Sequence, residues 1–84
     1  MSGIACASLG GGAPAADTFY DLGMMYSAGR DVPVDFIAAH KWFNLAAMRG
    51  NMEAIRLRRE IADQMSEQEI AQAQRAARAW LNGG

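Results

Sequence analysis

The residues of this chain that could do chemistry are few, and they stand apart from one another. His40 is the only histidine and Cys6 the only cysteine among the 84 residues. A metal site needs several such ligands at defined spacing, and nucleophilic catalysis needs a base and an orienting group beside the nucleophile. We therefore predict no catalytic residue, no metal ligand and no cofactor. We expect His40 to be a solvated helix residue and Cys6 a free thiol.

Two further patterns resemble functional motifs but have simpler explanations. Glu67 and Glu69 are close carboxylates, yet they follow Ser66 in an S-x-x-E capping box that starts a helix. The three glycines at 10–12 lack the Lys-Ser/Thr pair and the preceding strand of a phosphate-binding loop. Neither pattern supports an enzymatic activity.

A cluster of arginines is the last candidate. If the third and fourth expected helices pack antiparallel, a basic patch could form from Arg56, Arg58, Arg59, Arg75 and Arg78. Such a patch could bind an acidic peptide or a nucleic acid. Alternatively, nearby Glu and Asp side chains pair with the arginines on an ordinary surface. The net charge of −1 favours the second interpretation, and contact with nucleic acid is the weaker hypothesis.

Composition places the chain among small globular proteins. Hydrophobic residues make up 51% and charged residues 20%, which is typical of one folded domain. No apolar run approaches the about 20 residues of a membrane helix, and the first residues lack the basic and long apolar regions of a signal peptide. We therefore expect no membrane partner and a cytoplasmic location.

Helix start and stop signals divide most of the chain into four segments. We expect helices over about 16–28, 36–49, 51–65 and 67–81, after a flexible arm at 1–14. Asp35 and Asn51 suit N-cap positions, Gly29 and Gly50 suit the left-handed position after a helix, and Pro33 prevents continuation of the first helix. The prediction is an all-α domain at 15–84, with one hairpin at about 16–49 and another at about 51–81.

Helical spacing of the apolar residues predicts the core. Each helix has a stripe that should face its neighbours, and a glycine inside a helix, Gly23, usually lets another backbone come close. The expected stripes are Phe19, Leu22 and Tyr26; Phe36, Ala39, Phe43, Ala46 and Ala47 with Trp42 beside them; Ala54, Leu57, Ile61 and Met65; and Ile70, Ala73, Ala77, Trp80 and Leu81.

The first hairpin also carries a recognisable motif. It reads L-G-x-M-Y-x-x-G-x-x-V-P-x-D over 22–35 and A-x-x-W-F-x-x-A-A-x-x-G-N-x-x-A over 39–54. This pattern closely resembles a Sel1-like repeat, an α/α solenoid family related to tetratricopeptide repeats, and it covers one repeat and the opening of a second. The resemblance implies a short α/α solenoid that acts as a non-catalytic scaffold or adaptor for other proteins.

Two departures from the family pattern stand out. Asp31 occupies a loop position that is usually glycine, and aspartate tolerates left-handed geometry better than most residues. At the 36-residue offset from Pro14 to Gly50, the Leu-Gly pair at 22–23 becomes a pair of arginines at 58–59. The Gly-Pro loop is also absent from the second hairpin. We therefore expect that hairpin to be a divergent cap with a polar outer face.

The resemblance also implies where a partner would bind. In related solenoids the first helix of each hairpin lines the concave surface, which here would present Tyr20, Met24, Ser27, Arg56 and Arg59. The alternative is an ordinary surface or a dimer contact. One repeat plus a cap is short for a solenoid, so we expect either binding to another protein or peptide or self-association as a homodimer. A purely structural homo-oligomer is therefore the second functional hypothesis.

Overall fold

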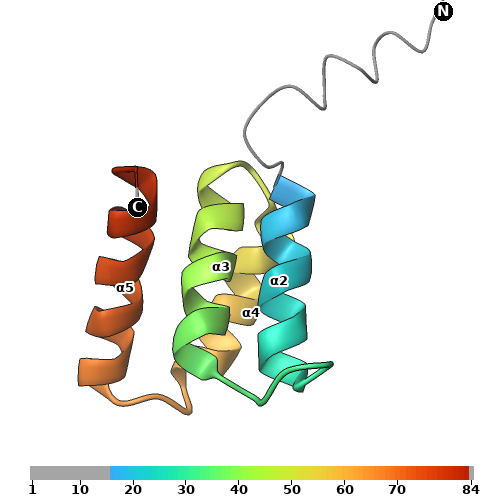
Figure 1. Cartoon of the computed structure of the whole chain (residues 1–84), viewed down its shortest axis with the longest axis vertical. Helices are drawn as coiled ribbons and strands as arrows, with labels where there is room; N and C mark the ends of the chain where they lie inside the picture. The colour runs from blue at the N-terminus through green and yellow to red at the C-terminus, as the bar shows by residue number, and fades with distance from the viewer. Residues whose placement is uncertain (1–15, 84) are drawn as a thin grey trace, which may run out of the picture.

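The computed structural model describes residues 16–83, and the regular structure in that range is entirely helical. The helices are α2 (Ala16–Ala28), α3 (Phe36–Met48), α4 (Met52–Ala62) and α5 (Glu67–Leu81) (Figure 1). This confirms the predicted all-α fold and its helix order. The expectations for the arm at 1–14, for Cys6 and for the glycines at 10–12 lie outside the described residues.

The three N-caps form as predicted. The Asp35 side chain accepts a hydrogen bond from the Ala38 N–H at 3.0 Å, and the Asn51 side chain accepts one from the Ala54 N–H at 3.0 Å. At the start of α5, the Ser66 hydroxyl accepts from the Glu69 N–H and the Glu69 carboxylate accepts from the Ser66 N–H. Each cap satisfies backbone donors that the first helical turn leaves without a partner.

The loop between α2 and α3 is set by two left-handed residues. Gly29 has φ +74° and Asp31 has φ +65°. The Gly29 N–H donates a hydrogen bond to the Met25 carbonyl at 2.9 Å, and the Asp35 N–H donates one to the Tyr26 carbonyl at 3.0 Å. Asp31 therefore adopts the conformation that glycine would otherwise supply, so this departure from the motif leaves the turn intact.

The boundaries of α3 and α4 differ from the prediction. Helix α3 ends at Met48, with Arg49 as its C-cap, and α4 ends at Ala62 although we expected it to reach 65. After α4 the Gln64 N–H donates to the Ile61 carbonyl at 2.9 Å, and the Met65 N–H donates to the Ala62 carbonyl at 3.0 Å. These i→i−3 bonds tighten the chain into a turn, which brings it directly to the Ser66 cap.

Helix α3 is the centre of the described fold. Helices α2, α4 and α5 each pack against it (Figure 1). Because neighbours surround it, α3 buries residues on more than one side: Phe43 and Leu45 are both about 1% exposed. Side chains that are two residues apart in a helix point in very different directions. The predicted stripe contained Phe43 but missed Leu45, because a single amphipathic stripe assumes one buried side.

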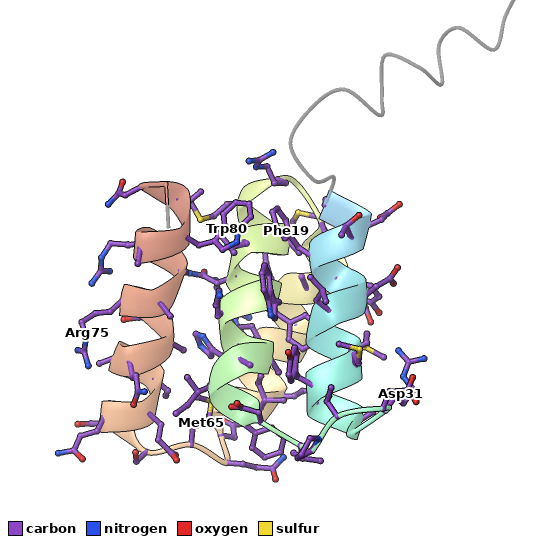
Figure 2. All side chains as sticks on the ribbon, in the orientation of Figure 1. Phe19, Asp31, Met65, Arg75 and Trp80 are labelled. Carbon is purple, nitrogen blue, oxygen red and sulfur yellow. The ribbon has the colours of Figure 1, made fainter. Side chains whose placement is uncertain are left out.

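Three aromatic rings join α2, α3 and α5. Phe19 stacks on Trp42 with ring centroids 5.8 Å apart, and the Trp80 ring meets Phe19 edge-on at 5.2 Å and Trp42 edge-on at 6.1 Å. Figure 2 shows Phe19 and Trp80 at the same end of the molecule. Phe19 is fully buried, whereas both tryptophans are half-buried. We name Phe19, Trp42 and Trp80 the aromatic cluster; it attaches the C-terminal helix to the first hairpin.

Candidate functional site

The predicted partner-binding residues of α2 lie along one side of that helix. Tyr20, Met24 and Ser27 follow an i, i+4, i+7 spacing, which places them on one face. The Tyr20 ring is half-buried and lies tilted beside Phe43, with centroids 6.0 Å apart. Met24 is half-buried against the core, and the Ser27 hydroxyl donates to the Met24 carbonyl at 3.2 Å. This face is therefore partly apolar, and its side chains are anchored at their bases.

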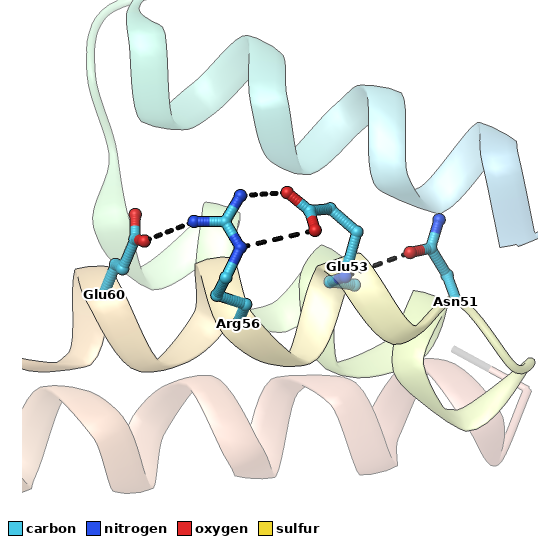
Figure 3. Close-up of polar contacts among 5 residues, drawn as sticks. Asn51, Glu53, Arg56 and Glu60 are labelled. Atoms are coloured by element: carbon cyan, nitrogen blue, oxygen red, sulfur yellow. Dashed lines mark hydrogen bonds and ion pairs between the residues drawn. The ribbon is translucent and has the colours of Figure 1, made fainter.

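Arg56 is the centre of a charged row on α4. Its guanidinium donates to Glu60 Oε2 at 2.6 Å and forms a two-point ion pair with Glu53 (Figure 3). The hydrogen bond from Arg56 lowers the pKa of Glu53, and Glu53 in turn raises the pKa of Arg56. More than half of the Arg56 side chain is exposed. Figures 1 and 3 both show α2 beside α4, and Figure 3 shows this row on the side of α4 toward α2.

Arg59 takes no part in the charged row around Arg56. It follows Glu53 by six residues, which places the two side chains about 120° apart around α4. Arg59 is exposed, and in the described part of the chain both ion pairs belong to Arg56. Arg58 instead turns to α3, where it donates to the Asn44 side chain. Of the two arginines predicted to contact a partner, Arg56 therefore belongs to the charged row and Arg59 does not.

The opposite side of α2 carries an open groove that the sequence analysis did not identify. Its volume is about 540 Å³, and it is lined by Thr18, Asp21, Leu22, Met25, Arg30 and Asp31. Leu22 was predicted to face the partner helix, but it is half-buried in this groove. The sequence signal that could have indicated the groove was the apolar pair Leu22 and Met25, which are three residues apart in the helix. A single-repeat pattern does not show whether a neighbour covers such a pair.

The expectation that His40 is solvated is wrong. Its side chain is buried at 4% exposure because α3 has neighbours on several sides, and its Nδ1 atom has no hydrogen-bond partner. Burial lowers the pKa of His40, and the nearby Arg58 charge lowers it further. Both effects disfavour the imidazolium form. His40 is thus a core residue that the folded chain keeps neutral.

The free energy of unfolding is expected to fall when the pH drops below the ordinary histidine pKa of about 6.5. In that range the unfolded chain binds a proton that the folded chain resists, because the pKa of His40 is lowered on folding. Stability therefore rises with pH across this window. Urea unfolding at pH 7 and pH 5.5 measures the effect. His40→Gln serves as the control, since the chain has no other histidine; an equal acid loss in that variant would contradict the assignment.

Other kinds of site were sought among the described residues. Within 16–83 no group of three or more His, Cys, Asp or Glu side chains is placed to hold a metal ion. None of the helices there is both long and apolar enough to span a bilayer. The two sides of α2 described above are the surfaces considered below as binding sites.

The fold defines the general class of the protein. Two helices joined by a left-handed loop, with the next helix packed against the second, form an α/α repeat. Residues 20–51 match the family model of the Sel1 repeat, and this stretch includes most of α2, the loop and all of α3. No curated protein and no solved structure shows a significant match. Sel1 repeats are non-catalytic modules that generally mediate protein–protein interaction.

Proposed function

We propose that this chain is an adaptor that binds a helix or peptide of another protein on the side shared by α2 and α4. The observation that carries the proposal is the Sel1 repeat at 20–51, because such repeats bind other proteins. The proposed contact residues are Tyr20, Met24 and Ser27 from α2 and Arg56 from α4, with Arg59 at the margin.

The packing of α2 supports this choice of surface. Tyr20 and Met24 are half-buried, so each has a fixed base on the core and an exposed part. An aromatic ring with few rotatable bonds loses little conformational entropy on binding, and a methionine side chain adapts to the shape of its partner. These properties suit recognition of apolar side chains on a partner segment.

The charged row on α4 supports the polar part of the contact. Exposed ion pairs are weak because water screens both charges, so a partner carboxylate can replace Glu53 or Glu60 at Arg56 with little loss. The row therefore holds the guanidinium in position without binding it strongly. The partner chemistry that fits best is an amphipathic segment with apolar anchors and an acidic residue.

A site-specific crosslinking experiment tests the proposal. A photoreactive amino acid at position 24 should capture a partner, whereas the same probe at position 74, exposed on α5, should not. The double variant Tyr20→Ala, Arg56→Glu should lose the captured protein at unchanged helix content, because it removes the ring and reverses the charge. Equal capture from positions 24 and 74, or capture that survives the double variant, would show that this surface does not bind the partner.

A further inference from the structure

Opposite charges lie on opposite sides of the molecule. Helix α2 contains Asp17 and Asp21 and no lysine or arginine, and the exposed Asp31 follows it in the loop. The outer side of α5 carries Arg75 and Arg78, both exposed. Figure 2 shows Asp31 on the far right, beyond α2, and Arg75 on the far left, pointing away from α5. Within 16–83 none of these side chains takes part in an ion pair.

The shapes of the two sides are also compatible. The α2 groove presents the half-buried Leu22 and Met25. On α5, Ala71, Arg75 and Ala79 follow one another at intervals of four residues, so two short side chains flank the first arginine on one line of the helix. Short side chains allow the longer ones of a facing helix to pack between them.

The direction of the helices brings opposite charges together at two places along them. The start of α2 and the end of α5 lie at the same end of the molecule (Figure 1). If copies stack side by side in one orientation, α5 of one copy runs antiparallel to α2 of the next. Asp21 then lies near the arginine end of α5. At the other end, Arg30 of the groove meets the first turn of α5, where Glu67 is exposed.

We propose that the α2 groove binds α5 of a second copy of this chain in a head-to-tail contact. The occupant is a second copy because this chain supplies a helix with the required charges in the required order. The contact uses the side of α2 opposite Tyr20 and Met24, so it is independent of the proposed partner surface. Two different surfaces meet in such a contact, so the assembly is open-ended and grows with concentration.

Charge reversal on one side at a time tests the contact. Asp21→Lys places a positive charge opposite the arginines of α5, and Arg75→Glu combined with Arg78→Glu places negative charges opposite Asp21. We expect each variant to associate on the order of tenfold more weakly than the unchanged chain, since attraction becomes repulsion at exposed pairs. Sedimentation across a concentration range at low salt measures this. Asp63→Lys is the matched control for Asp21→Lys, because it makes the same charge change outside both sides and should associate normally.

Mixing the two variants gives the decisive result. The lysine at position 21 then faces the glutamates at 75 and 78, and the unchanged Asp21 faces the unchanged arginines, so an equimolar mixture should regain the association that each variant lost. A constant monomer mass for the unchanged chain would overturn the proposal. So would a dimer that never grows larger, because two-fold symmetry joins identical surfaces. Failure of the mixture to associate would also overturn it.

Discussion

A leucine at position 23 is expected to destabilise the fold by more than any exposed substitution in α2. A Cβ atom on Gly23 would lie 2.5 Å from two carbons of the Phe43 ring. The ring cannot move away easily, because it is about 1% exposed and lies between α2 and the rest of the core. Overpacking of this kind costs about 1–3 kcal/mol, and leucine should reach the upper end of that range.

Alanine at position 23 tests which of two opposing effects is larger, the gain in helix propensity or the clash with the Phe43 ring. Glycine inside a helix costs about 1 kcal/mol relative to alanine, so Gly23→Ala would stabilise α2 if space were available. We expect it to destabilise the protein, because the clash at Phe43 exceeds the gain in helix propensity. Thermal and urea unfolding measure both variants. Ala28→Leu, which adds a leucine at an exposed position of the same helix, should change little. A melting temperature that rises in Gly23→Ala would disprove the close approach.

The features that sequence analysis predicted correctly depend on a few neighbouring residues. The Asp35, Asn51 and Ser66 caps each satisfy a backbone N–H three positions ahead. The left-handed conformations of Gly29 and Asp31 depend on local sterics. The Sel1 pattern combines many such local requirements, which explains why residues 20–51 also match the family model.

The features that it missed depend on where the helices go after they form. His40 and Leu45 are buried because α3 is surrounded, and the sequence of α3 alone does not specify that number of neighbours. Leu22 lines a groove for a related reason. Residues at the spacing of Leu22 and Met25 are buried when another helix covers α2 and half-exposed when none does. Leu81 was included in the expected stripe of α5, yet it is 41% exposed at the C-terminal end of that helix.

The candidate site was predicted only in part. Tyr20, Met24 and Ser27 share a face because helical periodicity requires it, so the sequence was sufficient there. The position of Arg56 depends on two neighbours in its own helix, Glu53 and Glu60, and the pairing with Glu60 was expected from i, i+4 spacing. The grouping of Arg59 with Arg56 as a partner contact stays a prediction, because only Arg56 belongs to the charged row.

Phe19→Ala is expected to have the largest effect of the single substitutions considered. Phe19 is about 1% exposed and contacts Trp42 and Trp80 at once. Removing a buried phenylalanine ring costs about 3–5 kcal/mol. Proteins have only about 0.05–0.15 kcal/mol of stability per residue, so the loss should unfold much of the population. Trp42→Ala should cost less than the full range for a buried aromatic residue, because Trp42 is half-buried.

Because the aromatic cluster includes Trp80, substitutions of Phe19 should weaken the attachment of α5 in particular. Trp80 is the aromatic residue of that helix, and its contacts with Phe19 and Trp42 join α5 to the first hairpin. Tryptophan fluorescence should therefore report early solvent exposure in Phe19→Leu, which keeps an apolar side chain of somewhat smaller volume but removes the ring. Phe36→Ala is the matched control, since it deletes the same ring from a half-buried position on α3. If Phe36→Ala costs as much stability as Phe19→Ala, the aromatic cluster has no special role in holding α5.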